Sequence, residues 1–181
     1  ADMGSYSSPC FSDIDNDGDK DLFMGNDHSV AFFRNTGSAA SPQLTLVTDS
    51  LPINISNFNY TPALGDLDGD GKKDMVVGYF ALAKLKFFKN TGTVQNPVFT
   101  LNASQMDTMN LQQSSAPALA DLDNDGDLDL LAGNSGGKLT YYRNIGTPQI
   151  FNFQFISNNY MNVTVGNDAA PSLGDVDGDG D

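Results

Sequence analysis

The sequence predicts an all-β fold assembled from repeated four-stranded antiparallel sheets. An acidic motif of the pattern D-x-D-x-D-G occurs four times, and its first aspartates are 53, 55 and 54 residues apart. Short apolar segments separated by turn residues follow each complete copy. The chain has no Glu, 18 Gly and only nine Lys and Arg, so its composition favours strands and turns over helices. Repeats of this length indicate that one small sheet forms per repeat.

Aligning the copies places the four strands of a repeat in order. In the third copy, residues 116–120 precede the acidic loop and 130–133 follow it, with Pro near the start of the first segment, where strands tolerate it. A third strand ends in the turn 142–146. The fourth strand alternates apolar and polar residues, which is typical of a half-buried strand. Its apolar pairs are Leu44 and Leu46, Phe99 and Leu101, and Phe153 and Phe155 in the three copies.

Four antiparallel strands per repeat predict a β-propeller, in which each small sheet is a blade that packs against the next. The repeat motifs begin at 13, 66, 121 and 175, and the last is truncated. Because propellers have roughly four to eight blades, we expect residues 1–181 to be a partial propeller from a larger protein. The segments 26–31, 79–86 and 134–138 differ in length, which marks them as surface loops between the second and third strands.

The acidic loop has the composition of a calcium site. Positions 1, 3, 5 and 9 are Asp in the complete copies, and their carboxylates are the hard oxygen ligands that calcium prefers. Position 6 is Gly and position 4 is Asn or Gly, which suits left-handed backbone angles in a tight loop. Position 7 includes Lys72, whose side chain cannot ligate a cation, so we expect this position to contribute its backbone carbonyl. The predicted metal-site residues are Asp13, Asp15, Asp17, Asp19, Asp21, Asp66, Asp68, Asp70, Lys72, Asp74, Asp121, Asp123, Asp125, Asp127, Asp129, Asp175, Asp177, Asp179 and Asp181.

Other sites fit the motif less well. An EF-hand needs Glu at position 12 and flanking helices, whereas position 12 here is Met24, Val77 or Ala132. Magnesium favours rigid octahedral sites that keep several waters, and zinc would want His or Cys, of which the chain has only His28 and Cys10. Solvated loops that bind no metal are the alternative, but four or five carboxylates within nine residues repel one another without a cation. We expect structural rather than catalytic ions.

The charge distribution limits the partners. The formal net charge is −14, and 18 of the 23 Asp residues lie inside the four motifs. This charge argues against nucleic acid, which binds clustered Lys and Arg. No apolar run approaches the roughly 18 residues of a membrane span, so we expect no membrane insertion. Cys10 is the single cysteine and occupies the position of Ala63, Ala118 and Ser172 in the other copies, which predicts a small buried residue.

The aligned segments resemble the FG-GAP family, specifically its bacterial VCBS-type branch, which is related to the repeats of integrin α-subunit propellers. The resemblance rests on Ala116-Pro117, the motif at 121–129, the strand at 130–133 and the turn at 142–146. The departure is that Phe-Gly is not evident and Gly-Ala-Pro appears only as Ala-Pro, Ser-Pro or Thr-Pro. The resemblance implies a calcium-binding propeller of about seven blades in a secreted or cell-surface protein, whose ligands engage the face opposite the calcium loops.

Three functions remain open at the level of the sequence. The first is a non-catalytic recognition or adhesion module that binds an extracellular protein or glycan. The others are a non-catalytic part of a secreted polysaccharide-active enzyme and an architectural subunit of a surface filament. One His, no Glu and no G-x-S-x-G motif argue against catalysis in this segment. An extracellular location suits calcium modules that work at millimolar calcium. Candidate ligand contacts are Asp27, His28, Tyr79, Phe80, Asn134 and Lys138, although Tyr79 and Phe80 could instead pack between blades.

Overall fold

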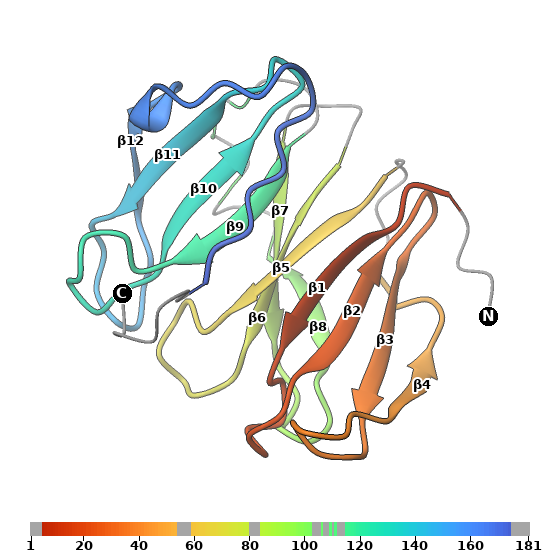
Figure 1. Ribbon diagram of the computed structural model, residues 1–181. Helices are drawn as coiled ribbons and strands as arrows, with labels where there is room; N and C mark the ends of the chain where they lie inside the picture. The colour runs from red at the N-terminus through yellow and green to blue at the C-terminus, as the bar shows by residue number, and fades with distance from the viewer. Residues whose placement is uncertain are drawn as a thin grey trace.

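The fold consists of three four-stranded antiparallel sheets, as the sequence predicts (Figure 1). The computed structural model describes residues 5–53, 59–79, 84–102, 106, 109, 111 and 115–174. A single-turn 3-10 helix, η1 (Tyr160–Asn162), follows the last strand. The fourth acidic motif, with Asp175, Asp177, Asp179 and Asp181, lies outside the described residues. Within the described part of the chain, no helix has the length and hydrophobicity that crossing a membrane requires.

Each sheet is an up-and-down meander of strands in chain order. The first sheet holds β1 (Ser8–Ser12), β2 (Asp21–Gly25), β3 (Val30–Asn35) and β4 (Leu44–Thr48). The second holds β5 (Thr61–Gly65), β6 (Asp74–Gly78), β7 (Leu85–Asn90) and β8 (Phe99–Asn102). The third holds β9 (Ala116–Ala120), β10 (Asp129–Gly133), β11 (Leu139–Asn144) and β12 (Phe153–Ser157). We call these sheets blades 1, 2 and 3.

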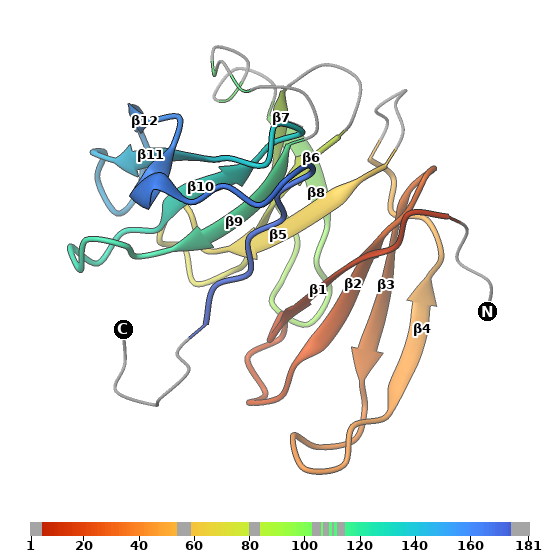
Figure 2. The ribbon, with the colours of Figure 1, turned by 45° about the horizontal axis from the view of Figure 1, so that its top comes forward.

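The blades stand side by side with their first strands innermost (Figures 1 and 2). Strand β5 contacts both β1 and β9, whereas the fourth strands lie at the outer rim. This arrangement is consistent with the blades of a propeller. Because strands in a blade are antiparallel, the β1–β2 connection and the β2–β3 connection lie at opposite ends.

Two apolar cores lie between successive blades. In the first core, the ring of Phe23 stacks on Phe32 with centroids 4.6 Å apart, and Phe99 of blade 2 meets Phe23 edge-on at 6.1 Å. In the second core, Phe87 of blade 2 meets Phe151 of blade 3 edge-on at 4.8 Å. A single blade has too little interior to bury these rings, so the blades stabilise one another by burying apolar surface at their interfaces.

The glycine that ends each second strand is required by close backbone approach. A Cβ on Gly25 would overlap the carbonyl oxygen of Tyr60, the residue that enters blade 2. Gly78 and Gly133 face the same obstacle at the next two blade junctions. At the first junction the Tyr60 N–H also donates to the Asn26 carbonyl oxygen, with 2.9 Å between N and O. Sequential blades are thus joined by backbone contact as well as by apolar packing.

The fourth strands are less buried than their alternating pattern predicts. Phe99 is 5% exposed, but Leu46, Leu101 and Phe155 are 44%, 44% and 53% exposed. The reason is geometric, because these strands form the outer rim of each blade and Phe99 is covered by packing on Phe23 of the preceding blade. The prediction of half-buried fourth strands is therefore wrong for these three positions and for Leu44, which is 42% exposed.

Two further predictions are adjusted by the strand register. The loops predicted at 26–31 and 79–86 are shorter, because Val30 pairs with Gly25 and Leu85 pairs with Gly78 at the start of the third strands. Cys10 is half-buried and packs against the first core, and burial raises the pKa of its thiol. The prediction of a small buried residue at this position is confirmed only in part, because Cys10 packs on the core but is half-buried.

Candidate metal sites

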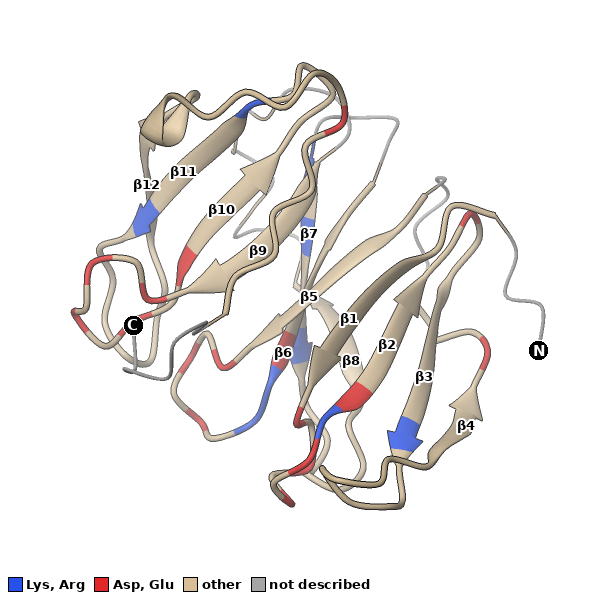
Figure 3. Ribbon diagram, viewed as in Figure 1, with Lys and Arg blue, Asp and Glu red and all other residues tan. Residues whose placement is uncertain are grey.

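The acidic loops connect the first and second strands of each blade and emerge at one common end of the three blades. Figure 3 shows their Asp residues at this end, with Arg and Lys on strand ends nearby. In each loop the carboxylates at positions 1, 3 and 5 offer oxygen atoms that all lie within 4.8 Å of one another. These triads are Asp13, Asp15 and Asp17 in blade 1, Asp66, Asp68 and Asp70 in blade 2, and Asp121, Asp123 and Asp125 in blade 3.

The loop backbone curls as the motif predicts. Position 4 is left-handed in all three loops, with φ of 59° at Asn16, 66° at Gly69 and 60° at Asn124. Position 6 also has positive φ, 97° at Gly18, 81° at Gly71 and 94° at Gly126. These turns bring the N–H of position 6 to the carboxylate of position 1, with N to O distances of 3.1, 2.9 and 2.8 Å in blades 1, 2 and 3. The prediction that these two positions reverse the chain is confirmed.

Position 9 lies apart from the triad and joins the loop to the blade. In blade 3, Asp129 is fully buried at the start of β10. Its Oδ1 accepts a hydrogen bond from the Asn144 N–H at 2.7 Å. Its Oδ2 accepts one from the Leu122 N–H at 3.2 Å and one from the Tyr141 hydroxyl at 2.9 Å. Burial and this hydrogen bond to Asp129 raise the pKa of Tyr141.

The equivalent residue of blade 2, Asp74, has two backbone donors. The Asn90 N–H donates to its Oδ1 at 2.8 Å and the Leu67 N–H to its Oδ2 at 3.3 Å. Burial raises the pKa of Asp74 to about 6 because these bonds do not fully compensate the lost hydration. In blade 1, burial likewise raises the pKa of Asp21, which accepts from Ile14 and Asn35. The role of position 9 as a metal ligand stays a prediction.

The asparagine that ends each third strand links the position 9 carboxylate to the turn that follows this strand. In blade 3, the Asn144 side-chain oxygen accepts hydrogen bonds from the N–H groups of Gly146 at 3.1 Å and Asn152 at 2.8 Å. Its own N–H is bound to Asp129. One buried Asn therefore closes the turn between β11 and β12 and links that turn to the acidic loop. Asn35 and Asn90 make the same turn bonds in the other blades.

A basic residue on each third strand reaches position 3 of the acidic loop, which sequence reasoning missed. The ion pairs are Arg34 with Asp15 at 3.3 Å between Nε and Oδ2, Lys89 with Asp68, and Arg143 with Asp123. The signal was present in the sequence, because a basic residue precedes the turn Asn in all three copies. It could not be interpreted without the sheet register, which carries the end of the third strand toward the loop.

Position 7 differs between the loops. In blades 1 and 3, the N–H groups of Asp19 and Asp127 each donate to the position 5 carboxylate at 3.1 Å. In blade 2, the Lys72 N–H makes the same bond to Asp70 at 3.0 Å, and its ammonium group donates to the Asn90 carbonyl oxygen at 2.9 Å and pairs with Asp70 at 3.1 Å. Partial burial works to raise the pKa of Asp70, but its hydrogen bonds with Lys72 and the charge of Lys72 outweigh this effect and lower it. The predicted carbonyl ligand at this position stays a prediction.

The donor atoms fit a hard divalent cation. The Oδ1 atoms of Asp15, Asp66 and Asp68 are buried and accept no hydrogen bond from the described residues. A buried carboxylate oxygen without a partner is costly, and one cation in the triad of blade 1 and another in that of blade 2 would satisfy these atoms. Clustered carboxylates without a neutral imidazole or a thiolate match the preference of calcium for oxygen ligands. The acidic triads can therefore hold metal ions.

The residues predicted to contact a ligand lie at the end of the blades opposite the acidic loops, and they differ in their exposure to solvent. His28 is exposed and its Nε2 lies 3.4 Å from a carboxylate oxygen of Asp27. Asn134 is buried, and its side-chain oxygen accepts from the N–H groups of Gly136 and Lys138. Tyr79 is 2% exposed and belongs to the core between blades 1 and 2, so the alternative of packing is confirmed for it. Phe80 lies outside the described residues.

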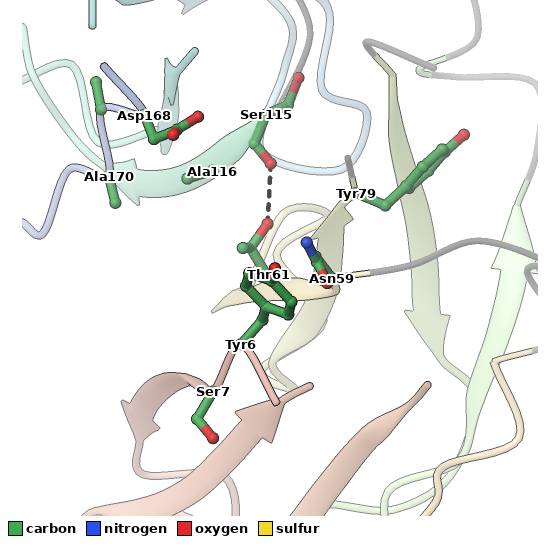
Figure 4. Close-up of a pocket in the computed structure, with 10 residues that line it drawn as sticks. Tyr6, Ser7, Asn59, Thr61, Tyr79, Ser115, Ala116, Asp168 and Ala170 are labelled. Carbon is green, nitrogen blue, oxygen red and sulfur yellow. Dashed lines mark hydrogen bonds between the residues drawn. The ribbon is translucent and has the colours of Figure 1, made fainter. Parts of the chain in front are cut away.

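A cleft of about 400 Å³ opens at this same end, where the chain enters successive blades (Figure 4). Its walls include Tyr6 and Ser7 before β1, Asn59 before β5, and Asp168 in the segment after β12. The Thr61 hydroxyl donates to the Ser115 carbonyl oxygen at 2.9 Å across its floor. No local sequence pattern indicates this cleft, because its residues come from different repeats.

The family described as FG-GAP-like repeat matches residues 13–77 and 121–181, which is more than half of the chain. No curated protein and no solved structure gives a significant match. The matched regions contain the acidic loops of blades 1, 2 and 3, whose geometry is described above. The chain belongs to the FG-GAP-like repeat family.

Proposed function

We propose that this chain is a calcium-stabilised extracellular recognition module that binds a protein or glycan through the end opposite its acidic loops. The observation that carries the proposal is the convergence of three carboxylates in each of three loops, repeated with the same backbone turns. A calcium ion in each triad would neutralise the mutual repulsion of the carboxylates and hold the loop closed. Millimolar calcium outside cells is sufficient for modules of this kind.

The arrangement of the blade explains why such ions would be structural. The triad belongs to a loop that the position 9 carboxylate ties to the third strand, as Asp129 does through Asn144. An ion that fixes the loop therefore also fixes the register of three strands at that end of the blade. The opposite end keeps its connecting loops available for contact with a partner. We assign no catalytic role to the chain, because most of its carboxylates lie in the acidic loops.

Calcium-dependent stability tests the scaffold. The melting temperature is measured with EDTA, with millimolar magnesium and with millimolar calcium. A ligand that binds only the folded state at one hundred times its dissociation constant adds about 2.7 kcal/mol per site, so we expect a large rise that magnesium does not reproduce. An unchanged melting temperature in millimolar calcium would refute the proposal.

The site assignment is tested by one variant with a matched control. Asp125→Ala removes a triad carboxylate from blade 3, and Asp49→Ala removes an exposed carboxylate outside the motifs. We expect calorimetric titration to show weakened calcium binding at one site for the first variant and unchanged binding for the second. An identical calcium stoichiometry and affinity in both variants contradicts the assignment.

A further inference from the structure

The cleft at the end opposite the acidic loops has the size of a ligand site. Its volume of about 400 Å³ lies within the range of roughly 300–1,000 Å³ that is usual for small-molecule pockets. The hydrogen bond from Thr61 to the Ser115 carbonyl oxygen joins the start of β5 to the residue before β9, so two blades hold the floor in place. We propose that this cleft binds the end of a neutral glycan. This inference rests on the proposed recognition function and specifies its site and ligand class.

The polar groups of the cleft suit a ligand rich in hydroxyl groups. Asp168 offers a carboxylate that only accepts hydrogen bonds when ionised, whereas the Asn59 amide both donates and accepts. A sugar hydroxyl can donate to the first and exchange hydrogen bonds with the second. Tyr6 adds an aromatic face on which the C–H groups of a sugar ring can pack, together with a phenol hydroxyl.

The charge of the cleft distinguishes neutral from acidic ligands. Among the described residues that line the cleft, Asp168 is the only charged one. The whole chain carries a formal charge of −14. An acidic oligosaccharide would meet repulsion at Asp168 without a compensating Lys or Arg in the cleft. A neutral sugar has no such penalty. The amide, carboxylate and phenol groups together also offer directional hydrogen bonds, which a sugar uses and a simple cation does not need.

The same position of the repeat supplies three of these groups. Tyr6, Asn59 and Asp168 each lie seven residues before the first Asp of an acidic motif. Each has a left-handed backbone, with φ of 57°, 58° and 52°. The fold therefore repeats one backbone turn around the cleft and places a different side chain on it each time. The repeated scaffold thereby presents three different polar or aromatic side chains at equivalent positions around a partly apolar cleft.

Tyr6 adds evidence of its own. A bulky residue at positive φ is strained, because its Cβ crowds the backbone, whereas Asn and Asp tolerate this region better. The Tyr6 side chain does not repay this strain by burial, since the residue is 73% exposed. Met161 combines a similar φ and exposure outside the cleft, so the evidence at Tyr6 is the place of its ring at the cleft and not the strain alone. Contact of this ring with a ligand accounts for an exposed aromatic residue at the rim of the cleft.

The test is a calorimetric titration in millimolar calcium with neutral glucan, mannan, xylan and chitin oligosaccharides. An oligogalacturonate and a lysine-rich peptide serve as acidic and basic comparison ligands. The cleft variants are Tyr6→Asn and Asp168→Asn, both compatible with positive φ. The matched control is Met161→Asn, since Met161 has φ 53°, is 74% exposed and lies outside the cleft. The calcium-induced rise in melting temperature is measured for every variant.

We expect at least one neutral oligosaccharide to bind, and each cleft variant to weaken that binding about tenfold, as loss of one good polar or stacking contact does. Met161→Asn should leave binding unchanged, and all variants should keep the calcium-induced stabilisation. Absence of binding by every neutral oligosaccharide overturns the inference, as does binding that the cleft variants leave intact. Preference for the acidic sugar or the basic peptide also overturns it.

The outcomes separate this inference from the proposed function. If calcium stabilises the protein and a partner binds through His28 or Lys138, shown by loss of binding in His28→Ala or Lys138→Ala, the recognition module stands and the cleft assignment falls. If calcium has no effect on melting, the proposed scaffold fails whatever the sugar titrations show.

Discussion

The acidic loops of blades 2 and 3 have nearly the same backbone but neutralise their carboxylates differently. The blade 3 loop carries Asp at position 7, whereas the blade 2 loop carries Lys72, which pairs with Asp70 and bonds the end of β7. Both loops also receive a basic side chain from the third strand, Lys89 at Asp68 and Asp70 in blade 2 and Arg143 at Asp123 and Asp125 in blade 3, so Lys72 is the additional cation of blade 2. In blade 2, lysine ammonium groups thus supply part of the positive charge that a bound ion would provide. The same loop conformation can therefore be stabilised by different proportions of side-chain positive charge and bound metal ion.

The two loops also differ at the buried position 9. Among the described residues, Asp129 has three donors, including the Tyr141 hydroxyl, whereas Asp74 has two. The pKa of Asp74 is raised by burial to about 6. A carboxylate whose pKa is raised in the folded state opposes folding at pH values above that pKa. In the absence of metal, we therefore expect Asp129 to stabilise its blade more than Asp74 does.

The largest expected effect is the loss of the position 9 carboxylate. Asp129→Ala leaves the buried Asn144 N–H, the half-buried Leu122 N–H and the Tyr141 hydroxyl without their acceptor, so we expect it to cost about 3 kcal/mol in metal-free protein. Asp74→Ala strands two N–H groups but removes a poorly hydrated charge, so we expect about 1–2 kcal/mol. Denaturant unfolding in EDTA at pH 7 measures both. Equal losses, or a larger loss for Asp74→Ala, would show that the third donor does not set the difference.

An intermediate effect is expected from exchanging position 4 between the loops. Gly69 tolerates its positive φ, but a Cβ there would overlap the carbonyl oxygen of Pro148 in blade 3. We expect Gly69→Asn to cost roughly 1–3 kcal/mol through this clash. The reverse exchange, Asn124→Gly, should change the free energy of unfolding by no more than about 0.5 kcal/mol, because Asn124 already has a left-handed backbone. Chemical denaturation in calcium measures both variants, and a neutral Gly69→Asn would contradict the clash.

A smaller loss of stability than those of Asp129→Ala and Gly69→Asn is expected at position 7. Lys72→Asp gives blade 2 the residue found in blades 1 and 3, and removes the contacts of its ammonium group with Asp70 and the Asn90 carbonyl. We expect a loss of about 1 kcal/mol in EDTA and a tighter calcium site in blade 2, because a carboxylate replaces a competing cation. Lys73→Asp is the control, because it makes the same change of charge at the next residue in the chain. If calcium titrations show the same change in affinity for both variants, the effect comes from overall charge and not from the position of Lys72 in the loop.

Much of the fold follows from local patterns. The first strands and the acidic loops lie where the Pro segments and the motifs place them, and positions 4 and 6 have the left-handed angles that Asn and Gly predict. Spacing alone located the triads, because residues two apart in a tight loop cannot be far from one another. The rim strands were predicted less well, since exposure of Leu46 and Phe155 depends on which neighbouring blade covers them.

The sequence by itself determined the repeat, the strand order and the three acidic triads, because these depend on residues close together in the chain. Only the tertiary structure decided which donors bind Asp129, which basic side chain reaches each loop, and that Tyr6, Asn59 and Asp168 surround one cleft. Those contacts join different strands or different blades. The spacing of residues along a chain does not specify how separate sheets pack, whereas the backbone approach at Gly25 and the apolar cores do.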